Sequence, residues 1–239
     1  MSQRINDLGQ PIGIPVSNWT RRPLPSKQAL EGRLCRLEVL RADEHAARLH
    51  EQNLADIEAR GWTYLPYGPF ASLADYTKFL QLAESQEDPI FYAIIDRASG
   101  EPVGVASYLR IDPAMGSIEV GHLRYTPALQ QTPASTEAMY LMMRHVFDDL
   151  GYRRYEWKCD SLNAPSVAAA RRLGFQFEGT FRQAAVTKGR NRDTSWLSIV
   201  DSEWPGIRDA LEGWLAPTNF DESGGQRRPL AELMPGSPS

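Results

Sequence analysis

The sequence predicts an α+β fold in which helices pack on a single sheet. Three strand-like runs follow one another in the middle of the chain, at 90–95, 103–111 and 117–125. The connections between them, at 98–100 and 112–116, are short and contain Gly, Pro, Ser or Asp, which is typical of hairpins. Helical patterns stand on both sides of these runs, and this order of elements fits one sheet covered by helices.

Before the three runs, the pattern predicts one strand and two helices. Residues 33–40 alternate as a strand does, and apolar residues within 42–60 recur near helical spacing. Ser72 is a candidate N-cap for a second helix over 73–84, with Asp75 three residues on as a partial capping box.

After the three runs, the chain is predicted to alternate between helix and strand. The expected elements are a helix over 134–150, a strand over 154–159, a helix over 165–173 and a hairpin of strands at 175–186 and 194–200. The first of these helices has one apolar stripe opposed by charged residues, so it packs on the sheet by one face. Gly151 and Gly174 stand where the C-caps of the two helices are expected.

The chain of 239 residues is predicted to form one domain between two arms. Residues 1–28 and 216–239 are rich in Pro or Gly and poor in apolar positions, so they cannot bury enough surface to offset their ordering entropy. Trp19 is the residue able to pin the N-terminal arm to the body, whereas 216–239 is expected to be a flexible tail. The domain itself is expected to span 29–215.

Composition excludes several classes of protein. The chain has 26 Lys+Arg against 30 Asp+Glu, a net charge of −4, which argues against nucleic acid as the main partner. Its two cysteines, Cys35 and Cys159, form neither a disulfide framework nor a metal-binding cluster. No window approaches the run of about 20 apolar residues that a membrane span needs. We therefore expect a cytoplasmic protein that uses neither metal nor membrane.

The junction between the strand at 117–125 and the following helix can hold an anion. A helix that starts near Ala134 after a tight turn presents unpaired backbone N–H groups and the positive end of its dipole. Ser135 and Thr136 can add hydroxyl donors. The alternative is an ordinary capped helix start.

A second segment, from Asn163-Ala-Pro-Ser166 to Gly174-Phe175, is informative together with the first. Asn163 is expected to cap a helix that Gly174 ends. The joint order is an anion-ready helix, a strand, then Asn-x-x-Ser and a helix that closes on Gly-Phe. In this order the chain resembles the GCN5-related N-acetyltransferase (GNAT) superfamily, and in particular its branch of ribosomal-protein N-terminal acetyltransferase-like enzymes, over about residues 30–205.

The resemblance implies a GNAT fold with acetyl-CoA as co-substrate. That fold is a single mixed, mostly antiparallel sheet of six to seven strands, with a V-shaped splay between two central strands and helices on both faces. Here the splay is expected between the strands that end near Tyr125 and begin near Arg154. The pantetheine arm is then expected to bond to backbone around Leu123 and Tyr125, and to the side-chain amide of Asn163.

The resemblance also places the pyrophosphate of acetyl-CoA on the turn that begins the helix, which in the family reads Gln/Arg-x-x-Gly-x-Gly/Ala. The residues expected to hold it are Gln130, Gln131, Thr132, Ala134, Ser135 and Thr136. Pro133 departs from the pattern because it replaces a glycine and removes one N–H donor. Its φ suits a first helical turn, so the amides after it are expected to take over.

A carboxylate and a hydroxyl are the predicted catalytic groups. An amine must lose a proton before it attacks, and a thiolate leaves more easily once protonated. Glu119 matches the general base of the histone-acetylating members, and alternation puts it on one face with Gly121, which leaves room beside the carboxylate. Ser166 matches a serine of the nearer branch that can protonate the thiolate. The alternatives are a solvent-facing strand residue and a plain helix-start hydroxyl.

Two further positions depart from the family. The nearer branch carries a glutamate base where this chain has Ala185, and many members carry a tyrosine acid where it has Ala170. His122 can titrate near physiological pH, but alternation predicts that it lies on the face opposite Glu119.

The stretch 62–70 is predicted to form the acceptor side of the site. Pro and Gly break it, so it is neither a regular helix nor a central strand. The expected wall consists of Trp62, Tyr64, Tyr67 and Phe70, because an aromatic loop between two helices is the substrate-facing region of the branch. The alternative is a hydrophobic plug beneath a long loop.

These observations lead to an acetyl-CoA-dependent N-acetyltransferase that transfers acetyl to a primary amine, a protein N-terminus or a small molecule, by direct attack in a ternary complex. Two alternatives stay open: a non-catalytic acyl-CoA-binding regulatory module, which the departures at Pro133, Ala170 and Ala185 motivate, and a fold relative whose pocket has closed. The hairpin around Gly189 is a candidate contact for a homodimer.

Overall fold

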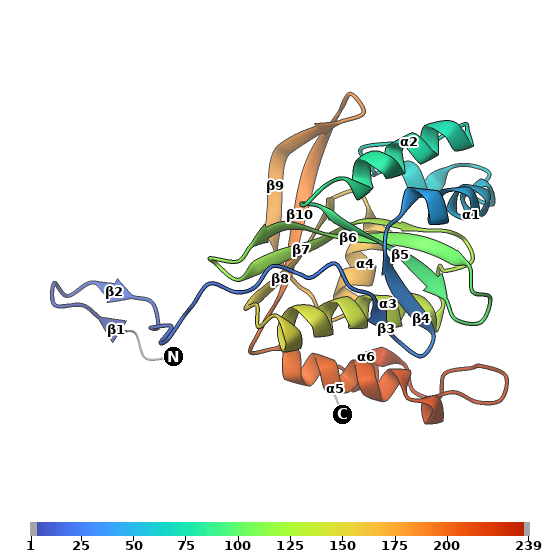
Figure 1. Cartoon of the computed structure of the whole chain (residues 1–239). Coiled ribbons are helices and arrows are strands. Elements are labelled where there is room, and N and C mark those ends of the chain that lie inside the picture. Colours follow the sequence, from blue (N-terminus) through green and yellow to red (C-terminus); the bar gives the residue numbers. More distant parts are fainter. Residues whose placement is uncertain (1–3, 237–239) are drawn as a thin grey trace.

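One mixed sheet of eight strands organises the fold of the computed structural model, which describes residues 4–236 (Figure 1). In spatial order the strands are β3 (Leu30–Glu31), β4 (Cys35–Val39), β5 (Ile90–Asp96), β6 (Pro102–Asp112), β7 (Ser117–Tyr125), β8 (Arg154–Asp160), β10 (Arg190–Val200) and β9 (Gln176–Thr187). Neighbouring strands are antiparallel, except that β7 and β8 are parallel. The predicted α+β class and the mostly antiparallel sheet are thereby confirmed. The strand beyond the expected six to seven is β3, which at two residues is too short to show alternation.

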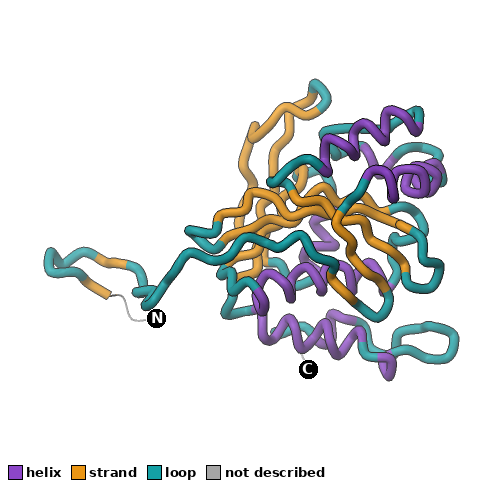
Figure 2. The backbone as a smooth tube through the Cα atoms, viewed as in Figure 1, coloured by secondary structure: helices purple, strands orange, loops and turns teal. Residues whose placement is uncertain are grey.

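Helices cover both faces of the sheet (Figures 1 and 2). On one face lie α1 (Ala42–Leu54) and α2 (Leu73–Glu84), and on the other lie α3 (Pro133–Arg144), α4 (Ala164–Arg172) and α5 (Trp204–Leu215). Each group buries its own cluster of apolar side chains against the strands. Both faces of the sheet are therefore covered by apolar side chains, and its central strands are buried.

The predicted helix caps form. The amide of Asp75 donates to Ser72 Oγ at 3.1 Å, and the amide of Ser166 donates to Asn163 Oδ1 at 3.2 Å. Gly151 and Gly174 take positive φ, +66° and +95°, as residues that follow a helix end commonly do. These local signals fix where the helices begin and end, and hence where α4 meets the sheet.

Three helices differ from the prediction. The helix expected over 134–150 is α-helical only to Arg144 and continues as a π-helical turn over His145–Asp149. The helix expected over 42–60 ends at Leu54, and Ile57, which continues the apolar spacing in the sequence, is 92% exposed. α5 is absent from the sequence prediction because Pro205, Gly206 and Gly213 are poor helix formers. Pro205 lies in the first turn, where a backbone N–H would have no acceptor within the helix, so the proline costs no hydrogen bond. A strong apolar face overrides the two glycines.

The parallel pair β7–β8 separates part of the way along. The two strands pair from Ser117 with Arg154 to Val120 with Trp157, after which β7 runs on to Tyr125 and β8 to Asp160 without pairing to each other. This is the predicted V-shaped splay. It leaves the backbone of β7 beyond Val120 without a strand neighbour on that side.

The two ends of the chain behave differently. At the N-terminus, the small hairpin of β1 (Arg4–Ile5) and β2 (Pro11–Ile12) extends away from the body (Figures 1 and 2). Trp19 attaches the following segment, because its Nε1 donates to the Ala114 carbonyl at 2.8 Å.

The segment after α5 contains η3 (Pro217–Asn219) and α6 (Leu230–Leu233). Leu230 is 2% exposed and belongs to the core cluster under α5. Within residues 4–236, no helix combines the length and the apolar character needed to cross a membrane.

Candidate active site

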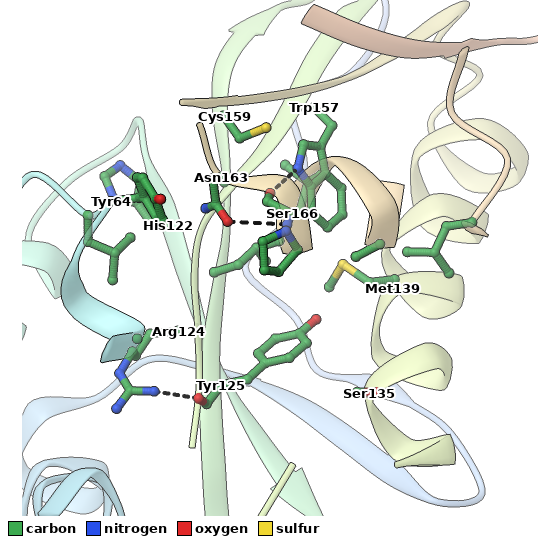
Figure 3. A pocket seen from close by; sticks show the side chains of 18 of the residues that line it. Tyr64, His122, Arg124, Tyr125, Ser135, Met139, Trp157, Cys159, Asn163 and Ser166 are labelled. Atoms are coloured by element: carbon green, nitrogen blue, oxygen red, sulfur yellow. Dashed lines mark hydrogen bonds between the residues drawn. The ribbon is translucent and has the colours of Figure 1, made fainter. Parts of the chain in front are cut away.

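A cavity of about 1490 Å³ occupies the splay between β7 and β8 (Figure 3). Its walls come from the ends of these strands, from the starts of α3 and α4, from the loop after α1 and from the β9–β10 hairpin. The predicted site residues that line it are Tyr64, Glu119, Leu123, Tyr125, Gln130, Gln131, Thr132, Ser135, Thr136, Asn163 and Ser166. Segments that are far apart in the sequence therefore meet around one cavity.

The start of α3 is a tight turn with free amides. Gln131 takes the left-handed conformation, with φ +59°, and Thr132 Oγ1 accepts the amide of Ser135 at 3.3 Å. Pro133 stands in the first helical turn, as expected. Within the described chain, the amides of Gln131 and Ala134 have no hydrogen-bond partner. These amides and the positive end of the helix dipole make this turn suited to an anion.

Tyr125 contributes both its backbone and its ring to the cavity. Its carbonyl accepts a hydrogen bond from the Arg124 guanidinium (Figure 3) and, at 3.0 Å, one from Gln130 Nε2. Its hydroxyl is buried and has no hydrogen-bond partner among residues 4–236. Burial holds the pKa of Tyr125 far above its ordinary value, so this hydroxyl stays protonated. An unpaired buried hydroxyl beside a cavity fits a polar ligand that supplies the missing hydrogen bond.

Asn163 and Ser166 begin α4 beside the end of β8. Asn163 Oδ1 is used by the cap, whereas its NH₂ group has no partner in the part of the chain that is described. Trp157 Nε1 donates to Ser166 Oγ at 2.9 Å (Figure 3). Because the indole N–H already points at the oxygen, the hydroxyl proton of Ser166 must point elsewhere, where it can be donated. Neighbouring Cys159 is a neutral thiol whose pKa is raised by burial.

Glu119 is buried and paired with two cations. It is 3% exposed, and Arg110 Nη1 contacts both of its carboxylate oxygens at 2.8 Å. Lys158 Nζ lies 2.9 Å from Oε2. A carboxylate has about four lone-pair sites, so these contacts leave one on Oε1. A Cβ built on Gly121 would lie 3.7 Å from that Oε1 and 2.9 Å from Leu109 Cδ2, so a larger residue here would press on the Leu109 side chain.

His122 lies on the same face of the sheet as Glu119, contrary to the expectation from alternation. Its φ is +52°, and the β6–β7 register shifts across this region. Val120 points into the α3 side of the core, whereas the His122 ring packs on Phe91, on the α1–α2 side, at 5.0 Å between centroids. A β-bulge cancels one step of the alternation, and the sequence carries no signal of it.

His122 is neutral at physiological pH. Burial first, and then the charges of Arg110 and Arg192, lower the pKa of His122 from 6.5 to about 4. Between about pH 6.5 and 4 the unfolded chain binds a proton on His122 that the folded chain does not bind. The folded state is therefore expected to lose stability as the pH falls through this range, and His122 adds no pH dependence of stability above it. An imidazole NMR titration checks the pKa directly. A midpoint near 6.5, or an equal acid loss of stability in a His122→Phe variant, would contradict this.

The aromatic stretch 62–70 divides into two parts. Trp62, Tyr67 and Phe70 pack against one another in the core beneath α1 and α2, and Trp62 is only 4% exposed. Tyr64 lines the cavity, and its hydroxyl donates to the Leu162 carbonyl at 3.1 Å, which ties the loop to the start of α4. The packing of the first three matches the alternative of a hydrophobic plug. Tyr67 still reaches the site indirectly, because its hydroxyl lies 3.1 Å from His122 Nδ1.

Several residues that line the cavity escaped sequence analysis. Lys158 could have been found, because the apolar alternation of its strand leaves it on the face of Glu119. Arg110 has a φ of +47°, which no pattern indicates, and Arg192 belongs to the hairpin that was considered only as a dimer contact. Trp214 and Phe220 line the other end of the cavity, and they were missed together with α5.

A splayed parallel pair whose gap leads from an anion-ready helix start to a buried carboxylate defines the class of acetyltransferases that bind acetyl-CoA between two strands. The comparisons agree: residues 36–176 match the family model of the acetyltransferase (GNAT) domain. The chain belongs to this family and is therefore an acetyl-CoA-dependent acetyltransferase.

Similar proteins extend over most of the chain. The crystal structure of a GCN5-related N-acetyltransferase from Brucella melitensis is 47% identical, with a TM-score of 0.90, and the match covers 91% of this chain and 99% of that one. An uncharacterized N-acetyltransferase, p20, from Bacillus licheniformis is 26% identical over 71% of this chain and 100% of its own length. RimL, a ribosomal alpha-N-protein acetyltransferase solved in complex with coenzyme A, is 23% identical with a TM-score of 0.62, covers 73% of this chain and 99% of its own, and shares the fold.

Proposed function

We propose that this protein transfers the acetyl group of acetyl-CoA to a primary amine, by direct attack within a ternary complex. The observation that carries the proposal is the single cavity that joins the start of α3, the start of α4 and the Glu119 carboxylate. From the start of α3 towards Glu119, the cavity offers an anion site, then hydrogen-bonding groups along the splay, and then a proton acceptor.

Acetyl-CoA would lie along the splay with its pyrophosphate at the start of α3. The free amides of Gln131 and Ala134 and the helix dipole favour the negative charge there. The Asn163 NH₂ group, which has no partner in the described residues, is available to donate to polar atoms of the pantetheine arm. When bound, acetyl-CoA supplies a thioester carbonyl activated for attack.

Glu119 is the proposed general base. Its carboxylate lines the cavity, and the contacts with Arg110 and Lys158 leave one lone-pair site on Oε1 free to accept a proton. The amine nitrogen forms its bond to the acetyl carbon while the C–S bond breaks, and the proton that the amine loses moves to Glu119. The thiolate takes its proton from the Ser166 hydroxyl, which water reprotonates.

Ser166→Ala is expected to lower kcat by less than about 10²-fold, since water can replace the hydroxyl as the donor. Trp157→Phe, which removes the N–H donated to Ser166 Oγ, should lower kcat in the same direction but less. Steady-state kinetics with acetyl-CoA and a working acceptor checks both. If Ser166→Ala only weakens acetyl-CoA binding and leaves kcat intact, Ser166 is not the acid.

The acceptor would be a protein N-terminus or a small-molecule amine. A calorimetric titration with acetyl-CoA, followed by a thiol-release screen over a broad amine panel, tests the proposal. Absence of binding at millimolar acetyl-CoA would overturn it.

A second candidate is a module that binds acyl-CoA without turnover. Two alanines favour it, because they stand where the family resemblance implies a catalytic tyrosine and a catalytic glutamate. Ala170 is fully buried, and Ala185 lines the cavity. Binding of acetyl-CoA with no thiol release for any amine would support this module in place of the enzyme.

A further inference from the structure

We propose that the acceptor of this enzyme is an amine that also carries a carboxylate, and that Arg192 binds this carboxylate. The inference rests on the proposed acetyl transfer and specifies its substrate class. It concerns the acceptor end of the cavity, which we define by Arg110, Glu119, His122, Ala185 and Arg192.

Arg192 is a cation without a counter-ion. Its Nε donates to Thr194 Oγ1 at 3.2 Å, and within residues 4–236 its guanidinium makes no ion pair. Ala185, the residue opposite it on β9, carries no charge. A half-buried guanidinium whose two terminal nitrogens remain free is suited to bidentate binding of a carboxylate.

Two acidic residues close to Arg192, one next to it in the sequence and one on the paired strand β8, form hydrogen bonds with other groups. Asp193 Oδ1 accepts the amide of Gln183 at 2.7 Å and the side chain of Asn191. Asp160, which lines the cavity, accepts the amide of Leu162 at 2.9 Å. Neither is within ion-pair distance of Arg192 among the described contacts, so its charge is left to a ligand.

Glu119 does not offset the positive charge either. Its single charge is shared by Arg110 and Lys158, and Lys158 also pairs with Glu156 at 2.7 Å. Arg110 uses only Nη1 for this contact, and its side chain is 62% exposed. Two guanidiniums from different strands, Arg110 and Arg192, therefore act on His122 from the cavity, and both depress the pKa of its imidazole.

This charge arrangement selects between amines. A polyamine would bring further positive charge next to Arg110 and Arg192 and would be disfavoured. An amino acid or an acidic peptide brings a carboxylate to Arg192, while its amine reaches the free lone-pair site on Glu119 Oε1. The transfer itself is unchanged: the N–C bond forms, the C–S bond breaks, and the amine proton moves to Glu119.

Matched pairs of acceptors test the proposal. We would measure kcat/KM for phenylalanine with 2-phenylethylamine, for methionine with methioninamide, and for Ser-Asp-Asp-Leu with Ser-Asn-Asn-Leu, both peptides amidated at the C-terminus, and include spermidine as the cationic amine. We expect the carboxylate-bearing member of at least one pair to be favoured by about tenfold or more. Arg192→Gln should remove this preference by raising KM for that member alone, and Arg192→Lys should restore part of it.

Arg190→Gln is the matched control, because Arg190 lies two residues away on the same strand and does not line the cavity. It should leave every ratio unchanged. Equal turnover of all pairs, a preference for spermidine, or an equal effect of Arg192→Gln on both members of a pair would overturn the assignment of Arg192 and leave the acetyl transfer intact. Acetyl-CoA binding without thiol release for any acceptor would instead overturn the proposed function.

Discussion

Glu119→Gln is expected to lower kcat by about 10²–10⁴-fold, because the carboxamide cannot accept the proton that the amine must lose. The change keeps the size of the side chain, and its oxygen can still accept a hydrogen bond from Arg110 or Lys158. KM for acetyl-CoA should change little, since Glu119 lines the part of the cavity that we propose for the acceptor. Stopped-flow or coupled measurement of thiol release, across pH 6 to 10, gives the required profile.

The matched control is Glu156→Gln. Glu156 also pairs with Lys158, at 2.7 Å, but it lies on β8 and does not line the cavity. If the charge network alone were important, both variants would lose activity to a similar extent. We expect Glu156→Gln to keep most of kcat, and a pH–rate profile that is the same in Glu119→Gln as in the wild type would reject Glu119 as the base.

The fold was largely predictable because its signals are local. Capping residues such as Ser72 and Asn163, and three strand-like runs joined by short connections, indicate elements from a few neighbouring positions. α5 was missed because its two glycines and Pro205 oppose the local preference, and tertiary burial of its apolar face decides the outcome.

The site was predictable only in part, for a different reason. Asn163, Ser166 and the turn at Gln130 to Thr136 follow each other in a recognisable order, so their meeting around the cavity could be expected. The bulge at His122 depends on how β7 pairs with β6, and the pairing of Glu119 with Arg110 and Lys158 depends on three strands at once. Contacts between strands that are distant in the sequence produce no periodic pattern that a single sequence shows.

The cofactor end of the site depends on a second buried carboxylate, that of Glu137. This residue lies on α3, one turn after its start, and is 5% exposed. Its carboxylate accepts three backbone amides of the β3–β4 connection: Arg33 at 3.0 Å, Leu34 at 2.6 Å and Cys35 at 2.7 Å. One side chain therefore fixes the helix that carries the anion site to the edge of the sheet.

Glu137→Ala is expected to lower the free energy of unfolding by about 3–5 kcal/mol, because it leaves three backbone donors without an acceptor in the interior. Gly32→Ala should act in the same direction, since its Cβ would lie 2.5 Å from Glu137 Oε2 and the carboxylate would have to move. Glu51→Ala, at an exposed position on α1, is the control and should change stability by less than about 0.5 kcal/mol. Urea unfolding of the four proteins measures these differences. A loss below about 1 kcal/mol for Glu137→Ala would mean that water replaces the carboxylate at these amides and that α3 is held by its apolar face alone.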